Sequence, residues 1–270
     1  MNKHNTIGKG VGERAVNGGL DKFYTKQFIA DFYSQVVLSR YGRDATYVEP
    51  TAGNGAFLNI LPDIQGYDLK PERSDVIEMD VFNNTFDKGS VIVGNPPFGM
   101  NAGLAIRIFN HIASFKCKAI CFIVPRSFKK LGVQDKLSLD YSLVFEQDVI
   151  PNAFTVDGKD KDVPCVFQIW EYKKKKRKAV GIVSCAWIEY TDKGSADIAV
   201  RRVGGKAGQL LSGLDYSPST TYFIKVKHAL VSKAIQLIDL SVVDNTAGVR
   251  SISKQELCYE VNKIMEVLSC

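Results

Sequence analysis

The sequence has few of the residues that build metal centres or disulfide-bonded scaffolds. Its three histidines are scattered, and its six cysteines lack the paired spacings of zinc ligands. Most cysteines lie in apolar runs, so we interpret them as buried free thiols in a reducing compartment and predict no metal site. The six are Cys117, Cys121, Cys165, Cys185, Cys258 and Cys270.

Long hydrophobic runs are also missing. No apolar stretch approaches the ~20 residues that span a bilayer, and Met1 to His4 is followed by no apolar signal segment. We therefore expect a cytoplasmic protein with no membrane contact. The 270 residues, 45% of them hydrophobic, suffice for one good core and a small additional unit. A net charge of +6 modestly favours a polyanionic partner.

The stretch Val91–Gly99 is the most informative part of the chain. A short β-branched run ends at Gly94 and is followed by Asn95, two prolines and Phe98, which predicts a buried strand ending at a rigid turn. The prolines have a fixed φ and no N–H, so they neither extend a sheet ladder nor continue a helix. Fixed oxygen acceptors beside an aromatic ring suit a planar group that carries an NH₂. The alternative is a plain strand-to-loop exit with Phe98 in the core.

A glycine-bearing turn precedes that stretch. The strand expected over 45–49 leads into a turn over 50–57 with Gly53 and Gly55, and then into a short helix. Strand, Gly-x-Gly turn and helix in succession are typical of the nucleotide-binding start of a doubly wound sheet. There the glycines allow a ligand to approach the backbone closely.

Acidic residues end three consecutive expected strands around this turn, namely Glu49, Asp68 and Asp80. An acid in the position of Asp68 commonly accepts hydrogen bonds from ribose hydroxyls. An acid followed by an apolar residue such as Val81 suits the amino edge and face of an adenine. Any one of these acids could be a solvated strand end, but three around one glycine turn indicate a ligand site.

Strands and helices alternate through the rest of the first 172 residues. Apolar spacing predicts a helix that starts after Thr25, a plausible N-cap, and ends near Gly42. A polar loop over 151–164 contains Phe154. Alternating elements with apolar strands predict a mostly parallel sheet flanked by helices. The further strands are expected over 64–68, 75–80, 91–93, 118–124, 141–150 and 165–172, and a further helix over 102–115.

The two ends of the chain differ from this α/β part. Residues 1–20 are rich in glycine and predict a flexible arm. Lys173–Lys178 is a run of six cations, which we expect in an exposed turn, either for solubility or as a phosphate contact. From 179 onward we expect a small α+β extension wrapped onto the sheet, with Ser253 and Glu256 as a capping box. Its strands are expected over 180–190, 196–203 and 222–226, and its helices over 227–240 and 253–268.

These motifs resemble those of the S-adenosylmethionine-dependent amino-methyltransferases, most closely the adenine-N6 DNA methyltransferases of restriction–modification systems and bacteriophages. Glu49–Phe57 looks like the cofactor motif, Asn95–Phe98 like the catalytic tetrapeptide, and Phe23–Thr25 like the motif that closes over the methionine end of the cofactor. Their order is similar to the gamma arrangement. The resemblance implies a Rossmann-like seven-stranded sheet whose last strand inserts antiparallel, over a core of 21–178 followed by the extension 179–270.

The resemblance also implies S-adenosylmethionine as the cofactor and a flipped-out adenine in DNA as the target. Catalysis would fall to Asn95, Pro96, Pro97 and Phe98. Cofactor contacts would come from Phe23, Tyr24, Thr25, Glu49, Thr51, Ala52, Gly53, Gly55, Asp68, Asp80, Val81 and Asn95. Candidate substrate contacts are the aromatic Phe154 and the cations Arg126, Lys173, Arg177, Arg201, Arg202 and Lys206.

Other substrates are compatible with the same tetrapeptide. Methyltransferases that act on adenine or guanine in RNA, and those that act on a glutamine amide in a protein, share it. A catalytically silent nucleic-acid-binding subunit is a further alternative. The basic C-terminal part favours a nucleic acid, and Gly99 favours DNA.

Overall fold

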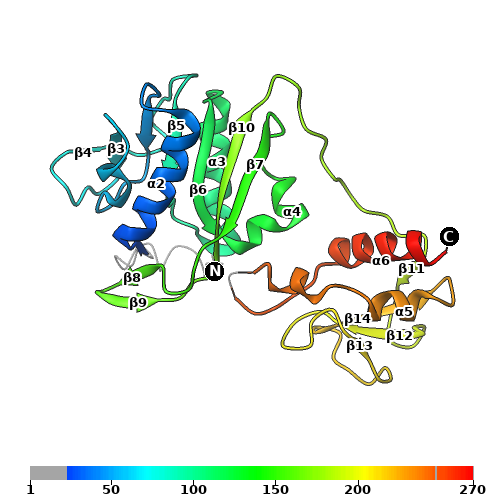
Figure 1. Ribbon diagram of the computed structural model, residues 1–270. Coiled ribbons are helices and arrows are strands. Elements are labelled where there is room, and N and C mark those ends of the chain that lie inside the picture. The colour runs from blue at the N-terminus through cyan, green and yellow to red at the C-terminus, as the bar shows by residue number, and fades with distance from the viewer. Residues whose placement is uncertain (1–22, 247, 270) are drawn as a thin grey trace, which may run out of the picture.

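The computed structural model describes residues 23–246 and 248–269, so the predicted arm over 1–20 lies outside the described residues. Its larger part is a seven-stranded sheet in the order β4-β3-β2-β5-β6-β10-β7 (Figure 1). The strands are β2 (Tyr47–Glu49), β3 (Gln65–Asp68), β4 (Val76–Glu78), β5 (Val91–Gly94), β6 (Ala119–Pro125), β7 (Tyr141–Asp148) and β10 (Cys165–Tyr172).

The direction of the strands confirms the predicted fold class. β2, β3, β4, β5 and β6 pair in parallel, whereas β10 pairs antiparallel with both β6 and β7. The last strand along the chain is therefore inserted between its two predecessors. Chain order reverses between β2 and β5, and in open α/β sheets ligands bind outside the carboxyl ends of the strands at such a point.

Helices α2 (Gln27–Tyr41) and α3 (Gly103–Ser114) cover opposite faces of this sheet. Val91 and Val93 pack in the same cluster as residues of α2, whereas Ile92 packs with residues of α3. This follows from the two-residue period of a strand, which turns successive side chains to opposite faces. β5 is buried along its whole length, so the turn that follows it starts from a rigid base.

The N-terminal motif differs from the prediction. Thr25 does not cap α2, whose N-cap is Lys26 without a side-chain hydrogen bond. Instead Thr25 belongs to a short strand, β1 (Tyr24–Thr25), which pairs antiparallel with β8. The predicted loop over 151–164 thus contains a hairpin, and its first strand holds the N-terminal motif in place. The hairpin strands are β8 (Phe154–Val156) and β9 (Lys159–Lys161).

The C-terminal part has a sheet and a core of its own, as Figure 1 shows. Its four strands are ordered β11-β14-β12-β13, so the expectation that it wraps onto the seven-stranded sheet is wrong. Ser253 and Glu256 form the predicted capping box of α6. The strands are β11 (Ile188–Tyr190), β12 (Ile198–Arg201), β13 (Leu210–Leu211) and β14 (Thr221–Val226), and the helices are α5 (Val231–Gln236) and α6 (Lys254–Leu268).

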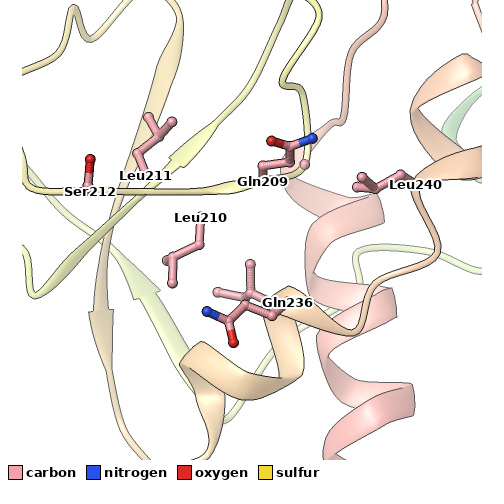
Figure 2. Close-up of a pocket in the computed structure, with 8 residues that line it drawn as sticks. Gln209, Leu210, Leu211, Ser212, Gln236 and Leu240 are labelled. Atoms are coloured by element: carbon pink, nitrogen blue, oxygen red, sulfur yellow. The ribbon is translucent and has the colours of Figure 1, made fainter.

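A cavity of about 500 Å³ lies within this C-terminal part. Figure 2 shows β13 on one side of it and Gln236 and Leu240 on another. All of its lining residues belong to 208–240. The cavity is therefore separate from the glycine turn and the acidic strand ends.

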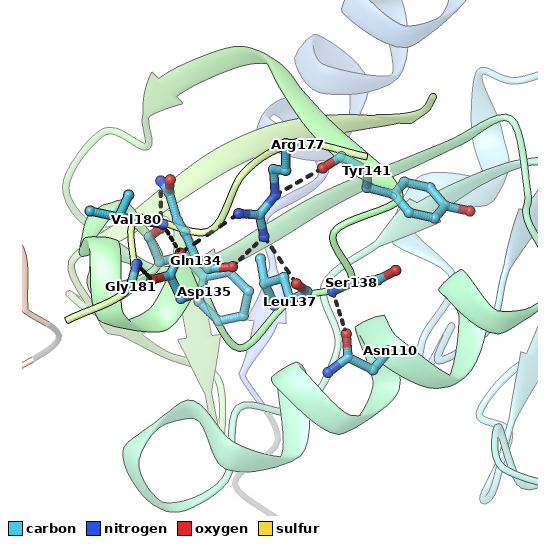
Figure 3. A network of polar contacts seen from close by, with 10 residues as sticks. Asn110, Gln134, Asp135, Leu137, Ser138, Tyr141, Arg177, Val180 and Gly181 are labelled. Carbon is cyan, nitrogen blue, oxygen red and sulfur yellow. Dashed lines mark hydrogen bonds and ion pairs between the residues drawn. The ribbon is translucent and has the colours of Figure 1, made fainter. Parts of the chain in front are cut away.

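The segment that leaves β10 is anchored by Arg177. Its guanidinium donates to the carbonyl oxygens of Gln134, Leu137 and Tyr141 (Figure 3) and lies over the ring of Trp170 at 5.4 Å. Burial lowers the pKa of this guanidinium. The prediction of six exposed cations is thus wrong at Arg177, because three backbone carbonyls outcompete water for it.

A side-chain substitution separates this anchoring role from a nucleic-acid contact. Arg177→Gln removes the donors of three carbonyl oxygens, and we expect a loss of about 2 kcal/mol in the free energy of unfolding. Urea denaturation measures it. The adjacent Lys178→Gln is the matched control because Lys178 is exposed, and it should change stability by less than ~0.5 kcal/mol. Equal effects of the two substitutions would contradict the anchoring role.

Candidate active site

The carboxyl ends of β2, β3 and β5 bring the predicted site residues to one edge of the sheet. Glu49 ends β2, Asp68 ends β3 and Asn95 follows β5 directly. A Cβ added to Gly94 would lie 3.4 Å from Glu49 Oε1, so the Glu49 side chain packs against the end of β5. Residues separated in sequence by a helix and two strands therefore share one small site.

The Asn95 side chain is oriented by the N-terminal motif. Its Nδ2 donates to the carbonyl oxygen of Phe23 at 3.0 Å. A carbonyl oxygen can only accept a hydrogen bond, so the amide atom that faces Phe23 must be the NH₂ nitrogen. The other amide atom of Asn95 is therefore the oxygen. Asn95 Oδ1 is left buried, without a hydrogen-bond partner among the described residues. The site thus presents one fixed, unused acceptor directly after the buried strand.

Glu49 is the most deeply buried acid of the site, with 2% of its surface exposed. Burial raises the pKa of its carboxyl well above the ordinary value, repulsion from Asp68 adds to this, and Arg73 opposes it. Its Oε2 has no hydrogen-bond partner in the described part of the chain. A buried carboxylate without a partner is costly, and a cationic group of a ligand would relieve that cost.

Asp68 holds the glycine turn against β3. Its two carboxylate oxygens accept hydrogen bonds from the N–H groups of Gly53 and Lys70, both at 2.8 Å. Each oxygen retains acceptor capacity for a further donor. Asp80 similarly accepts from the N–H of Phe82 at 2.9 Å, with Val81 buried beside it. Both acids shape their own loops in addition to any ligand contact.

Arg73 is a site residue that sequence reasoning missed. It donates to the carbonyl oxygen of Gly55 and to Asn59 Oδ1, both at 3.0 Å, and pairs with Asp75 at 2.6 Å. Gly55 has φ +75°, and a Cβ there would lie 2.5 Å from Arg73 Cδ. The positive φ favours glycine at this position, and a side chain there would also displace the end of the Arg73 side chain. No sequence motif signals an arginine eighteen residues beyond the turn.

The Phe23–Thr25 motif lies against the glycine turn. A Cβ built on Gly53 would lie 3.7 Å from Tyr24 Cε1, and the Tyr24 hydroxyl donates to Glu72. The Thr25 hydroxyl oxygen is buried, with no hydrogen-bond partner among the described residues. The small sheet of β1 and β8 is what carries these side chains to the site.

Unpartnered polar atoms are concentrated at this edge. Within residues 23–246 and 248–269, eight buried side-chain nitrogen or oxygen atoms lack a hydrogen-bond partner. Five of the eight belong to predicted site residues, namely Thr25, Glu49, Thr51, Asn95 and Arg126. Buried polar groups are normally satisfied, so this concentration indicates a place where a polar ligand supplies the missing partners.

Phe98 lies beside Asn95 and faces another aromatic ring. The rings of Phe98 and Phe23 are nearly parallel, with centroids 6.5 Å apart and planes inclined by 13°. The Phe98 carbonyl accepts from Leu104 and Ala105 at the start of α3. Gly99 has φ +67°, and a Cβ there would lie 2.7 Å from Leu104 Cβ. The turn of the tetrapeptide is therefore attached to α3 through a position that requires glycine.

Phe154 does not lie where it was predicted. It is 1% exposed and packs in the hydrophobic core beneath α2, because its register with Thr25 in the small sheet turns the side chain inward. It offers no free face to a base, and the ring parallel to Phe98 is that of Phe23. The prediction of Phe154 as a stacking residue is therefore wrong.

The predicted cations lie in two separate regions. Arg126 follows β6, and its Nε is 3.8 Å from Asp148, whereas Lys173 pairs with Glu171 at 2.7 Å. Arg177 is internal, as described above. Arg201, Arg202 and Lys206 belong to the C-terminal part, at and after the end of β12. The cations do not form one continuous patch around Asn95.

Comparison with known proteins gives a methyltransferase-like assignment for part of the chain. Residues 65–176 match the family model of the EDM2 methyltransferase-like domain, a segment that includes Asp68, Asp80 and Asn95 but covers less than half of the chain. No curated protein matches at the significance threshold applied. Within the part of the chain that the structure describes, no cluster of metal-ligating side chains is found, and no helix has the length and apolarity of a membrane span.

Two solved structures are similar to part of this chain. A candidate RNA methyltransferase from Pyrococcus horikoshii is 14% identical, with a TM-score of 0.45 over 57% of this chain and 87% of that one. The modification subunit of a candidate type I restriction enzyme from Vibrio vulnificus is 16% identical, with a TM-score of 0.42 over 60% of this chain. The present chain spans 46% of the length of the Vibrio protein. At these scores neither carries an argument about function.

The raised pKa of Glu49 has a measurable consequence for stability. The folded state holds this proton more tightly than the unfolded chain, whose glutamates titrate near ~4.3. The contribution of this bound proton to the free energy of unfolding is therefore complete below that pH. It is lost as the pH rises through the pKa of Glu49 in the folded state. We expect Glu49→Gln to become increasingly more stable than the wild type as the pH rises, measured by thermal unfolding of the ligand-free protein. Glu78→Gln, at an exposed position, should show no such trend.

Proposed function

We propose that this protein transfers a methyl group from S-adenosylmethionine to the N6 amino group of adenine in DNA. The observation that carries the proposal is the free, buried Oδ1 of Asn95, oriented by Phe23 beside the ring of Phe98. This acceptor stands at the same sheet edge as Glu49 and Asp68. The match of residues 65–176 to a methyltransferase-like domain supports methyl transfer as the reaction.

The residues present fit the cofactor. The buried carboxyl of Glu49, whose Oε2 has no hydrogen-bond partner among the described residues, suits the ammonium of the methionine portion. The hydroxyls of Thr25 and Thr51, which likewise lack a partner there, could bind further groups. Asp68 retains acceptor capacity for ribose hydroxyls, and Asp80 with Val81 would hold the adenine moiety. Tyr24 and Arg73 close over the glycine turn. The cofactor supplies a methyl group made electrophilic by a positively charged sulfur.

Asn95 and Pro96 would prepare the amine of the target. The lone pair of the adenine N6 is delocalised into the ring, so this nitrogen is a poor nucleophile. Hydrogen bonds from its two N–H groups to Asn95 Oδ1 and to the Pro96 carbonyl would draw the nitrogen toward tetrahedral geometry. The nitrogen–methyl bond would form as the methyl–sulfur bond breaks, leaving a neutral thioether, and the positively charged nitrogen would then lose one proton to solvent. Because that proton is acidic, no strong general base is needed, and the rate acceleration would come from positioning and from fixed dipoles.

The target base has to leave a duplex, which costs a few kcal/mol. Stacking on Phe98 would return ~1–3 kcal/mol per base. We assign to Phe23 the stacking role that was predicted for Phe154, because the ring of Phe23 faces Phe98. The carbonyl of Phe23 also orients Asn95. The basic charge of the chain, +6 overall, supports a nucleic acid as the carrier of that base.

Removal of the Asn95 carboxamide tests the proposal. In Asn95→Ala we expect the rate of tritiated methyl transfer to adenine-containing DNA to fall by at least ~100-fold, the scale of losing one fixed polar group in a catalytic site. Cofactor affinity, measured by calorimetry, should change by less than ~3-fold because Asn95 acts mainly on the target. Parallel assays with RNA and with a glutamine-containing peptide compare the alternative substrates.

The matched control is Asn83→Ala, an exposed asparagine that follows β4, and it should retain wild-type transfer. If Asn95→Ala transfers methyl groups at the wild-type rate, Asn95 has no role in the reaction. If the wild-type protein transfers methyl groups to RNA or peptide but not to DNA, the substrate assignment is wrong while the chemistry of the site stands.

The burial of Glu49 predicts that cofactor binding depends on pH. An ammonium group next to Glu49 favours the carboxylate, whereas burial in the free protein favours the protonated form. Binding therefore releases a proton, and affinity for S-adenosylmethionine should rise as the pH increases above the ordinary glutamate range near ~4.3. In Glu49→Gln this dependence should disappear and affinity should be low throughout. Calorimetry in two buffers of different ionisation enthalpy counts the proton. Identical pH profiles of the two proteins would place the ammonium elsewhere.

A further inference from the structure

The C-terminal part contains a second cavity, of about 370 Å³, that the proposed reaction does not use. It lies where the ends of β11 and β12, the start of β14 and the start of α6 meet. This volume is near the lower end of the ~300–1,000 Å³ usual for ligand pockets, which corresponds to one nucleotide-sized group. The lining residues include Tyr190, Lys193, Arg202, Thr221, Tyr222 and Lys254.

Two cations of this pocket lie on aromatic rings. Lys254 Nζ is 4.6 Å from the centroid of Tyr190, and the Arg202 guanidinium is 6.0 Å from that of Tyr222. Neither forms an ion pair with any residue of 23–246 or 248–269; Arg202 has only a long hydrogen bond, of 3.5 Å, to the Ser219 carbonyl. Within the described residues, neither charge is therefore neutralised by an ion pair.

The two other charged residues of the lining are already engaged. The Asp192 carboxylate accepts hydrogen bonds from the N–H groups of Gly194 and Ser195 and from the Ser195 hydroxyl. Lys193 pairs with Asp215 at 2.6 Å. With Lys193 paired to Asp215, the lining keeps an excess of positive charge, because Arg202 and Lys254 are positive and Asp192 alone is negative.

The aromatic walls of the pocket are held rigidly. The Tyr190 hydroxyl donates to the Lys254 carbonyl at 2.9 Å, and the Tyr222 hydroxyl donates to the Ile252 carbonyl at 3.1 Å. The two rings contact each other edge to face, with centroids 5.4 Å apart. Both rings are therefore tied through their hydroxyls to the backbone at the start of α6.

Thr221 supplies an independent sign of a missing ligand. This residue lines the pocket and is 3% exposed, and its hydroxyl oxygen has no hydrogen-bond partner among the residues that the structure describes. It is the sole member of the C-terminal part among the eight unpartnered atoms found in 23–246 and 248–269. An acceptor group in the pocket would satisfy this donor together with the two free cations.

We propose that the pocket formed by Tyr190, Arg202, Thr221, Tyr222 and Lys254 binds a phosphoryl group of the nucleic-acid strand, outside the catalytic edge. Arg202 and Lys254 neutralise the phosphate, the Thr221 hydroxyl donates to one of its oxygens, and the tyrosine rings wall the attached sugar or base. This inference rests on the proposed function for the identity of the strand as DNA. It gives the C-terminal part the task of holding the DNA while a base is presented to Asn95.

The first test is DNA binding by the full chain carrying Arg202→Gln and Lys254→Gln. We expect affinity for a fluorescein-labelled, adenine-containing oligonucleotide to fall by at least ~10-fold, and the slope of log K against log salt to decrease by about 0.9 per lost phosphate contact. Lys225→Gln with Lys227→Gln is the matched control. It removes the same number of cations from exposed positions at the end of β14, where Lys227 pairs with Glu189 at 3.1 Å, and should change affinity by less than ~3-fold. Equal losses in both double variants, or no loss in either, overturn the proposal.

The second test uses Thr221→Val, which keeps the shape of the side chain and removes the hydroxyl. A buried donor without a partner does not help folding, so thermal stability should stay unchanged or rise, while DNA affinity should fall several-fold. A threonine with a merely structural role would leave DNA affinity unchanged, and that result overturns the proposal. Binding of AMP is measured on the same variants. If AMP binding is lost while oligonucleotide affinity is unchanged, the pocket binds a free nucleotide, and its assignment to a nucleic-acid strand is wrong.

The two proposals fail in distinguishable ways. Cofactor affinity should be the same in the wild type and in all of these variants, because no substituted residue belongs to the catalytic edge. Pocket-dependent DNA binding without methyl transfer by the wild type overturns the proposed function and keeps the pocket. Methyl transfer to DNA with unchanged DNA affinity in the variants overturns the pocket and keeps the function.

Discussion

The hydrogen bond from Asn95 to the backbone of Phe23 is the interaction on which the candidate site depends. An unrestrained carboxamide would present its NH₂ or its oxygen to a ligand with similar ease, and only the oxygen can accept from an amine. The carbonyl of Phe23 removes that ambiguity. The N-terminal motif, through its pairing with the β8 hairpin, thereby controls the chemistry available at the end of β5.

The burial of polar groups away from water is the second constraint on the sheet edge that carries Glu49, Asp68 and Asn95. Glu49 is buried with an unpartnered oxygen, and the orphan atoms of Thr25, Thr51 and Asn95 lie in the same predicted site. A fold retains such costs where a ligand offsets them. The same reasoning applies to Thr221 in the C-terminal part, which lines a pocket together with Arg202 and Lys254. Among the described residues, the Thr221 hydroxyl has no hydrogen-bond partner and neither cation has an ion pair. The two places are chemically different, since the first suits a cation and the second an anion.

The two parts of the chain are connected in a defined way. Arg177 fastens the segment after β10 to three carbonyls, and Lys130 contacts Glu256 at 3.2 Å and the Ser251 carbonyl at 3.2 Å. Glu256 also belongs to the capping box of α6, so the start of α6 is linked to the seven-stranded part. Lys254, at this same helix start, lines the proposed phosphate pocket. A strand held there would therefore be positioned relative to the catalytic edge.

The sequence by itself determined the order of strands and helices in the seven-stranded part and the acids and glycines at the strand ends, because two- and 3.6-residue periodicities and turn residues are local signals. The antiparallel last strand was expected only from the resemblance to the amino-methyltransferases. Tertiary structure alone decided the rest. Thr25 became part of a strand and not a cap, Phe154 turned into the core, and Arg177 was drawn to buried carbonyls. Arg73, the orientation of Asn95 and the pocket around Thr221 were equally invisible. Each of these outcomes depends on contacts between side chains and atoms that are tens of residues away in the sequence. Packing and desolvation determine those contacts, and a local sequence pattern does not encode them.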